Sequence, residues 1–299
     1  MEKIYQELKK TFKERIKKDY PLSEFTTFKT GGKAKIIVFP ENIDEVKKIL
    51  KISSEYGIKT VFLGNGSNVL ISDDGIDGIV IITSLMKNIG IENGYIFAEC
   101  GVKISSLLKF LILNKKGGLE FLAGIPGTVG GATFTNSGLK KEWISKRIKK
   151  VDVLDKEGNI LSLKDSSLKF SYRKSNLEGY FIWKVYLELM EKNEEEIKEE
   201  IKKFIIMRKK KQPIGERCAG SVFKNLENGI FAGKIIENCG LKGYRIGGAK
   251  VSEKHANFII NTGNATSSQI YSLIKLIQKI VKEKYNIELE TEIKLIGKF

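Results

Sequence analysis

The stretch GIPGTVGGA, residues 124–132, is the most informative segment of this chain. Four of its nine residues are glycine, and Pro126 is one of only four prolines in the sequence. Glycine loses the most conformational entropy in regular structure and proline lacks a backbone N–H, so the stretch predicts a sharp turn instead of a helix or strand. Such a turn exposes N–H groups at which phosphate can bind. An ordinary surface turn is the simpler alternative.

A second loop of the same character, GNGSN at residues 64–68, follows a β-branched run that predicts a buried strand at 58–64. Two loops of small residues indicate one long, multiply charged ligand. The candidate cofactor-binding residues are therefore Gly64, Asn65, Gly66, Ser67 and Asn68 in the first loop, and Gly124, Ile125, Pro126, Gly127, Thr128, Gly130 and Gly131 in the second.

Neither standard nucleotide motif fits these glycines. GNGSNV at 64–69 lacks the third glycine of a dinucleotide fingerprint, and GYRIGGAKV at 243–251 has Ala249 between Gly248 and Lys250, so it is no P-loop. Glycines that could bind an anion without either motif indicate a flavin domain of another type.

Composition narrows the class of protein. A chain of 299 residues favours two domains, and 41% hydrophobic with 29% charged residues is typical of a globular protein. The net charge of +16 attracts polyanions, but the lysines are dispersed along the chain. Dispersed charge favours a nucleotide-type small molecule over nucleic acid or membrane, and a solvated lysine surface explains most of the excess.

Cysteine and histidine usage argues against a metal centre. Cys100, Cys218 and Cys239 show no C-x-x-C spacing, and His255 is the only histidine, so we expect no disulfide framework and no metal. Residues 1–18 predict a charged amphipathic helix without an apolar signal core, and no segment is apolar enough to span a membrane. A cytoplasmic location is expected.

The hydrophobic pattern predicts an α+β fold whose strands are partly linked as hairpins, unlike a pure βαβ array. Asn42 and Glu45 have the spacing of a capping box at the start of a helix that runs to Gly57. The other expected helices cover residues 104–115, 193–213, 231–240 and 267–285, and the expected strands cover 78–83, hairpins around 93–94 and 157–158, 180–189, 255–261 and 287–297.

Six ordered motifs carry a resemblance to a known family. They are GNGSNVL at 64–70, AGIPGTVGGA at 123–132, SYRKS at 171–175, GSVFKN at 220–225, AGKIIENCGLKGYRIGGAKVSEKHANFIIN at 232–261 and LETEIKLIG at 289–297. Together they resemble the UDP-N-acetylenolpyruvoylglucosamine reductases, the MurB family, over nearly the whole chain.

The resemblance implies a fold and a reaction. Residues 22–190, after an N-terminal helix within 1–21, are expected to form an FAD-binding domain of the vanillyl-alcohol oxidase type. Residues 191–213 are expected to be a connecting helix, and 214–299 an α+β substrate-binding domain whose last strand returns to the FAD domain. The implied reaction uses NADPH and noncovalent FAD to reduce a UDP-sugar enolpyruvate for peptidoglycan synthesis, in a protein that we expect to be a monomer.

The resemblance also assigns roles to residues. The reaction needs a hydride, a proton and stabilisation of negative charge that spreads into a carboxylate. Arg173 and Glu292 match the family's pair on the carboxylate side of the substrate, and Ser221 matches its proton donor. Without the resemblance, Arg173 and Glu292 would be interpreted as a surface ion pair and Ser221 as a serine in a turn. The expected substrate-binding residues are Lys224, Asn225, Tyr244 and Arg245.

The sequence departs from the family pattern at three positions, Ser137, Leu226 and Lys250. Too few residues separate Arg173 from Ser221 for the tyrosine-bearing insertion of the longer class, which indicates the short class. Two other functions stay open at this point, another flavin oxidase of the same fold and a basic nucleic-acid-binding protein.

We expect the purified protein to be yellow and to release all of its FAD on denaturation. Neither glycine loop contains a histidine or cysteine that could bond covalently to a flavin. The measurement is the absorbance of the supernatant and of the precipitated chain after acid treatment. Colour that stays with the precipitate would contradict noncovalent binding.

Overall fold

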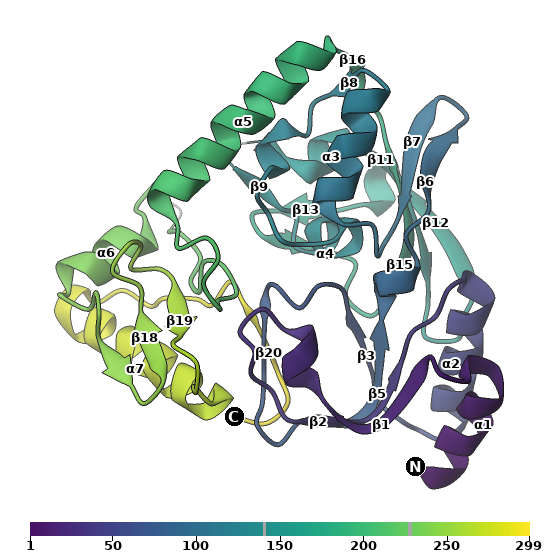
Figure 1. Cartoon of the computed structure of the whole chain (residues 1–299), viewed down its shortest axis with the longest axis horizontal. Helices are drawn as coiled ribbons and strands as arrows, with labels where there is room; N and C mark the ends of the chain where they lie inside the picture. The colour runs from purple at the N-terminus through teal and green to yellow at the C-terminus, as the bar shows by residue number, and fades with distance from the viewer. Residues whose placement is uncertain (140–141, 227–228) are drawn as a thin grey trace. The chain divides into compact units, whose positions relative to one another are not determined.

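The computed structural model describes residues 1–139, 142–226 and 229–299, which divide into two units (Figure 1). Unit 1 comprises residues 1–19, 35–65 and 77–206, and unit 2 comprises 20–34, 66–76 and 207–299. Each unit has a hydrophobic core of its own. The assignment of FAD binding to 22–190 and of substrate binding to 214–299 stays a prediction.

Each predicted helical segment contains a helix, the first one much shorter than predicted, and α4 is an additional helix. Within the described residues the helices are α1 Glu2–Phe12, α2 Ile43–Glu55, α3 Ile104–Leu113, α4 Val129–Phe134, α5 Glu194–Lys211, α6 Ala232–Asn238 and α7 Ser267–Tyr285. The helix predicted before Pro213 is confirmed as α5.

Unit 1 is built around two sheets. A four-stranded sheet has the order β1 (Ile16–Pro21), β2 (Lys33–Val38), β5 (Ile76–Ile82), β3 (Thr60–Leu63), and β3 and β5 pair in parallel. A five-stranded antiparallel sheet has the order β12 (Ile160–Lys164), β11 (Ile148–Leu154), β15 (Phe181–Leu187), β7 (Tyr95–Glu99), β6 (Ile89–Glu92). The mixture of parallel and antiparallel strands with helices confirms the predicted α+β class.

Short two-stranded ribbons complete unit 1. They are β9 (Gly138–Leu139) with β10 (Glu142–Trp143), β13 (Phe170–Ser171) with β14 (Lys174–Ser175), and β8 (Lys116–Gly117) with β16 (Met190–Glu191). These ribbons were not predicted from the sequence, because two residues are too few to show an alternating pattern.

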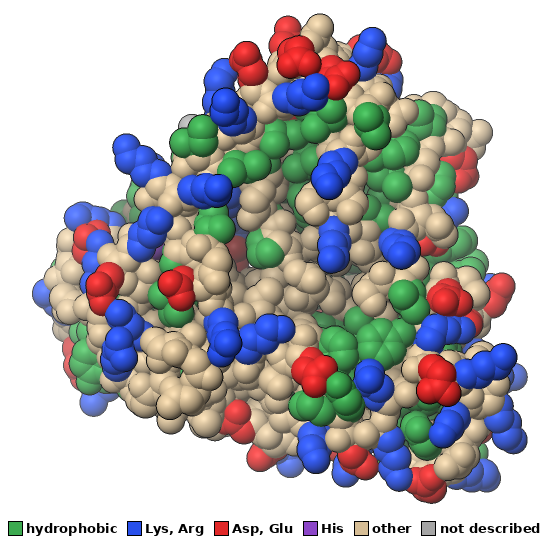
Figure 2. Space-filling view, in the orientation of Figure 1, with side chains coloured by type: hydrophobic (Ala, Val, Ile, Leu, Met, Phe, Trp, Pro, Cys, Tyr) green, Lys and Arg blue, Asp and Glu red, His purple; other side chains and the backbone are tan. Residues whose placement is uncertain are grey.

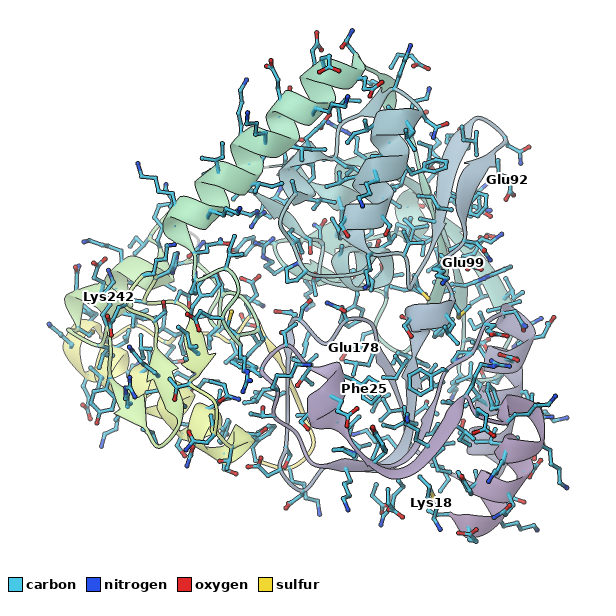
Figure 3. All side chains as sticks on the ribbon, viewed as in Figure 1. Lys18, Phe25, Glu92, Glu99, Glu178 and Lys242 are labelled. Carbon is cyan, nitrogen blue, oxygen red and sulfur yellow. The ribbon has the colours of Figure 1, made fainter. Side chains whose placement is uncertain are left out.

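Both predicted hairpins are confirmed. Asn93 and Gly94 connect β6 to β7 with positive φ of 50° and 80°, as the Asn-Gly signal requires. Glu92 lies at this turn and Glu99 at the other end of β7 (Figure 3). The second hairpin joins β11 to β12.

The N-terminal helix is shorter than predicted. Buried Ile4, Leu8 and Phe12 recur every four residues, but the chain turns at Lys13, where φ is 50°, and β1 begins at Ile16. The expectation of a helix through residue 18 was therefore wrong. Lysines lie on both sides of the turn, so the sequence looks like the polar face of one continuous helix and does not show where the apolar periodicity ends.

The start of α2 corrects the predicted capping box. The Asn42 side chain accepts the N–H of Glu45 at 3.0 Å, which confirms the cap. The Glu45 carboxylate does not bond back to Asn42, because it accepts two hydrogen bonds from Arg15 at 2.7 and 2.6 Å and one from the N–H of Glu41 at 2.8 Å. The bonds from Arg15 hold the pKa of Glu45 below its ordinary value.

The central glycine stretch is only partly a turn. Residues 124–128 are irregular, but Val129, Gly130, Gly131 and Ala132 belong to α4, which is capped by Thr128 and packs against β15. The expectation that this stretch forms no helix was wrong for its second half. Gly130 is required there, because a Cβ on it would lie 2.7 Å from Cβ of Cys100.

Unit 2 contains a three-stranded antiparallel sheet, β17 (Arg245–Ile246), β18 (Ala249–Val251) and β19 (Ile259–Asn261), beside α6 and α7. The last strand, β20 (Lys294–Ile296), pairs in parallel with β4 (Val69–Ile71). The final strand is shorter than the predicted 287–297, and its partner is a segment more than 200 residues earlier in the chain.

The N-terminus of α7 is capped by residues from two distant segments. Thr266 and Gln269 form a capping box, so the predicted cap is confirmed. Asp73 accepts the N–H groups of Ser267 and Ser268, each at 2.8 Å, and the Ser268 hydroxyl at 2.6 Å. Burial alone would raise the pKa of Asp73, but the bonds from Ser268 and Ser267 outweigh it and lower this pKa.

We expect Asp73→Ala to lower the free energy of unfolding of unit 2 by about 1 kcal/mol, the typical value of a lost helix cap. Because the folded pKa of Asp73 lies below the unfolded value, its contribution is present above the unfolded pKa and is lost as the pH falls through the folded one. Urea unfolding at pH 7 and below pH 4 measures both effects. Asp74→Ala, at the exposed neighbour, is the control. Equal losses in both variants would contradict the cap.

Candidate functional site

The two predicted glycine loops meet in unit 1. The side-chain amide of Asn65 donates to the carbonyl of Pro126 at 2.5 Å. Gly64 lies against Thr128, since a Cβ on Gly64 would be 2.6 Å from the Thr128 hydroxyl oxygen. This contact requires glycine, because Thr128 is buried and its hydroxyl already accepts the N–H of Gly131. The two loops are therefore adjacent in unit 1, and their binding of one common ligand stays a prediction.

Free backbone donors are what a diphosphate would need from these loops. The N–H groups of Val129 and Gly130 are already used, since they donate to the carbonyls of Val102 and Cys100. By contrast, the N–H groups of Gly124, Gly127 and Thr128 reach no acceptor in residues 1–139, 142–226 and 229–299. The donors of this loop lie before α4, and the residue pattern fits an anionic group there.

The GNGSN loop continues into unit 2, and it also has backbone N–H groups without an acceptor in the described residues. Within the described chain, the N–H groups of Gly66, Ser67 and Asn68 also donate to no acceptor. Gly66 has φ of 58°, and a Cβ on it would lie 2.0 Å from the carbonyl oxygen of Phe25, the last residue of a 3-10 turn (Figure 3). Only glycine fits, so consecutive amides stay available for an anion.

Arg173 lies in unit 1 in a strained backbone conformation. It occupies the turn between β13 and β14 with φ of 56°, a region that residues with side chains seldom adopt. Its Nη2 donates to the carbonyl of Gly138 at 3.2 Å, and its guanidinium lies over the rings of Trp143 and Tyr172 at 5.5 and 5.4 Å. The two rings contact each other edge to face, with centroids 5.6 Å apart, so the guanidinium lies against a pair of aromatic rings.

The turn that carries Arg173 is tied to the end of α4. The Asn136 side chain donates to the carbonyl of Ser171 at 2.9 Å, and the Ser175 hydroxyl donates to the carbonyl of Phe134 at 2.7 Å. Asn136 and Trp143 were not predicted as supports of Arg173. Asn136 directly precedes Ser137, one of the departures from the family pattern, whereas nothing in the local sequence marks Trp143.

Ser221 and Glu292 lie on paired segments of unit 2. Phe223 and Thr291 form an antiparallel bridge, and the N–H of Glu292 donates to the carbonyl of Val222 at 2.7 Å. The backbone of the predicted proton donor is thereby adjacent to the backbone of the predicted acidic residue. Two of the three predicted catalytic residues thus lie on paired segments of unit 2, and Arg173 belongs to unit 1.

The predicted substrate-binding residues also belong to unit 2. Lys224 forms an ion pair with Glu290 at 2.5 Å, and its N–H donates to the carbonyl of Glu290. Asn225 accepts the N–H of Ala232 at 3.2 Å. Tyr244 is 45% exposed, and Arg245 pairs with Lys250 across β17 and β18.

The three departures from the family pattern have ordinary partners. Ser137 shares a hydrogen bond with the hydroxyl of Thr135 at 3.0 Å, and the N–H of Leu226 donates to the carbonyl of Ile230 at 3.0 Å. Lys250 pairs with Glu253 at 2.5 Å.

Other kinds of site lack support in the described residues. Cys100, Cys218 and Cys239 are free thiols, and burial raises the pKa of Cys100 to about 12. The described part of the chain has no cluster of histidine, cysteine and acidic residues suited to a metal ion. None of its helices combines the length and hydropathy required to cross a bilayer.

Comparisons with known proteins define the class. A model described as an FAD binding domain matches residues 34–164, and the C-terminal domain of UDP-N-acetylenolpyruvoylglucosamine reductase matches residues 212–296. The fold is that of an FAD-containing oxidoreductase with a flavin domain of the vanillyl-alcohol oxidase type.

Full-length relatives narrow the class to one family. UDP-N-acetylenolpyruvoylglucosamine reductase of Caldanaerobacter subterraneus subsp. tengcongensis is 42% identical over 98% of this chain and 98% of its own. That of Caldicellulosiruptor saccharolyticus is 46% identical over 94% of this chain and 92% of its own. The crystal structure of the Thermus caldophilus enzyme, MurB, has a TM-score of 0.83 with 31% identity, covering 95% of this chain and 99% of that one. This chain belongs to the UDP-N-acetylenolpyruvoylglucosamine reductase family.

We expect Gly131→Ala to reduce FAD retention without loss of fold stability. A Cβ on Gly131 meets only the Thr128 hydroxyl at 3.6 Å, an ordinary contact, and alanine favours the helix by about 1 kcal/mol. Any loss of FAD would therefore show that the added methyl group obstructs FAD binding.

The measurements are FAD content after gel filtration and thermal unfolding of the FAD-free protein. Gly131→Val enlarges the obstruction at the same position. Full FAD occupancy in both variants would show that the cofactor does not approach this glycine.

Proposed function

We infer that this protein reduces UDP-N-acetylglucosamine enolpyruvate to UDP-N-acetylmuramate, with NADPH as the hydride donor and FAD as its cofactor, in peptidoglycan precursor synthesis. The observation that carries this inference is the family membership over nearly the whole chain. The meeting of the two glycine loops supports it independently, because those loops offer backbone donors for the diphosphate of FAD.

Bound FAD supplies the hydride that the alkene carbon receives. The protein has to hold the cofactor and the substrate, to deliver a proton to the neighbouring carbon, and to stabilise negative charge that develops on the enolpyruvyl carboxylate. We assign cofactor binding to residues 64–68 and to Gly124, Ile125, Pro126, Gly127, Thr128, Gly130 and Gly131.

We assign the proton transfer to Ser221. A serine hydroxyl is a weak acid, but a carbanionic enol is basic enough to take its proton, and the small side chain permits close approach to the carbon. Ser221 lies in a segment whose backbone is paired with residues 290–292, which restrains its position.

We assign charge stabilisation to Arg173 and Glu292. The planar guanidinium of Arg173 can hold a carboxylate with two parallel hydrogen bonds, and its contacts with the rings of Trp143 and Tyr172 reduce the entropy lost on binding. Glu292 helps beside a developing negative charge only while it is protonated or donates through a hydrogen-bonded partner.

We assign substrate binding to Lys224, Asn225, Tyr244 and Arg245. The ion pair of Lys224 involves Glu290, whose side chain is 73% exposed. Exposed ion pairs contribute about 0–1 kcal/mol, so a diphosphate can replace Glu290 as the partner of Lys224. Tyr244 and Arg245 are both exposed and can reach a bound ligand.

Two alternatives are weakened by observation. Lys and Arg side chains are interspersed with acidic side chains on the visible face and do not gather into a basic patch (Figure 2), which argues against nucleic-acid binding. A different flavin oxidase of the same fold would not share a C-terminal domain with the reductase family. We further propose a cytoplasmic location, consistent with three free thiols, and a monomer.

We expect Ser221→Ala to slow reduction of the enolpyruvyl group by about 10²- to 10⁴-fold, the usual effect of losing a positioned general acid. Reduction of FAD by NADPH should keep nearly its normal rate, because that step uses no proton for the alkene. Stopped-flow absorbance measures the two half-reactions separately.

Ser54→Ala serves as a control, because this serine is exposed on α2 in unit 1 and lies outside the six motifs. A Ser221→Ala protein with normal substrate turnover, or with slow FAD reduction, would remove Ser221 from the proton-donor role.

A further inference from the structure

The segment 220–225 carries Ser221, Lys224 and Asn225 and has partners on both of its edges. On one edge, the N–H of Glu292 donates to the carbonyl of Val222 at 2.7 Å, and the N–H of Lys224 donates to the carbonyl of Glu290 at 2.9 Å. These bonds use Val222 and Lys224, so the backbone N–H and C=O of Phe223 point to the opposite edge.

On the opposite edge, one side chain takes the place of a neighbouring strand. The Asn257 side chain accepts the N–H of Phe223 at 2.9 Å through Oδ1 and donates to the carbonyl of Phe223 at 2.8 Å through Nδ2. The backbone carbonyl of Asn257 also accepts the N–H of Val222 at 2.8 Å. Three hydrogen bonds from one residue thus fix the backbone next to Ser221.

Asn257 is itself held in place. It is 3% exposed, and its N–H donates to Nδ1 of His255 at 3.2 Å. Burial lowers the pKa of His255, which favours the neutral imidazole that Nδ1 needs to accept this bond. The N–H of His255 donates to the Ser252 hydroxyl at 3.3 Å. Hydrogen bonds within residues 252–257 therefore fix the loop that carries Asn257.

We propose that Asn257 is a positioning residue for proton transfer, which sets the place of Ser221 through the backbone of Val222 and Phe223. This inference rests on the proposed function and adds a residue to it. An amide is needed because Phe223 presents a donor and an acceptor together, so aspartate would lack the donor and leucine would lack both. Asn257 binds the segment 220–225 from its buried side.

We test this with Asn257→Asp and Asn257→Leu. Misplacement of a reacting group by about 1 Å can cost 10²-fold, so we expect reduction of the enolpyruvyl group to slow by about 10²-fold. FAD content and the rate of FAD reduction by NADPH should stay near normal. The solvent deuterium isotope effect on the slowed half-reaction should rise as the proton transfer becomes rate-limiting, which loss of stability alone would not produce.

Asn261 provides a matched control. It is equally buried in unit 2, at 3% exposure, and its side chain also binds backbone: it donates to the carbonyl of Phe28 at 2.7 Å and accepts the N–H groups of Gly263 and Ala265. Asn261→Asp and Asn261→Leu should lose comparable stability but keep the normal isotope effect.

Two results would overturn the proposal. One is an unchanged isotope effect and rate in Asn257→Asp, and the other is the same change in the Asn261 variants. If Asn257→Leu does not fold, Asn257→Gln retains the amide with one extra methylene and decides by the same readouts. A wild-type protein that failed to reduce the UDP-sugar would instead reject the proposed function, so the two failures are distinguishable.

Discussion

Close approach of backbone without side chains is the constraint on which the cofactor region depends. Gly64 lies against the buried Thr128, and Gly130 lies against Cys100, at distances that leave no room for a Cβ. The Asn65 amide then joins the two loops through the carbonyl of Pro126. Because α4 uses its own first N–H groups for bonds to Val102 and Cys100, the amides that remain available for an anion lie in the irregular residues before it. The glycines therefore serve packing and ligand access at once.

In unit 2 the predicted catalytic residues depend on a short backbone pairing that few side chains support. Residues 222–224 and 290–292 pair over a single bridge, and one buried amide, Asn257, satisfies the edge that this bridge leaves unpaired. The pairing joins the predicted proton donor and the predicted acid over a separation of about seventy residues. A short, braced segment suits catalysis, because a proton donor must keep its position while the substrate enters and leaves.

Much of the secondary structure followed from local pattern, and the errors have identifiable causes. The helix 267–285 with its Thr266 cap was predicted to the residue, since amphipathic period, cap and termination all agree there. The N-terminal helix was extended too far, because lysine-rich sequence after Phe12 gives no apolar signal to mark the turn at Lys13. No helix was predicted for residues 129–132, because glycine has a low helix propensity. Tertiary contacts with Cys100 and β15 outweigh that propensity in α4.

The α+β class, the two glycine loops and the motifs of the reductase family could all be predicted from the sequence, because they depend on residue types that few other backbones or reactions require. The contacts between groups that are distant in the chain could not be predicted in this way. The Asp73 cap on α7, the parallel pairing of β4 with β20, the stacking of Arg173 on Trp143 and the bonds of Asn257 to Phe223 all join residues that no local period connects. The physical reason is that such contacts are specified by chain topology and by buried hydrogen-bonding groups that must be satisfied, and neither is visible in a sequence window.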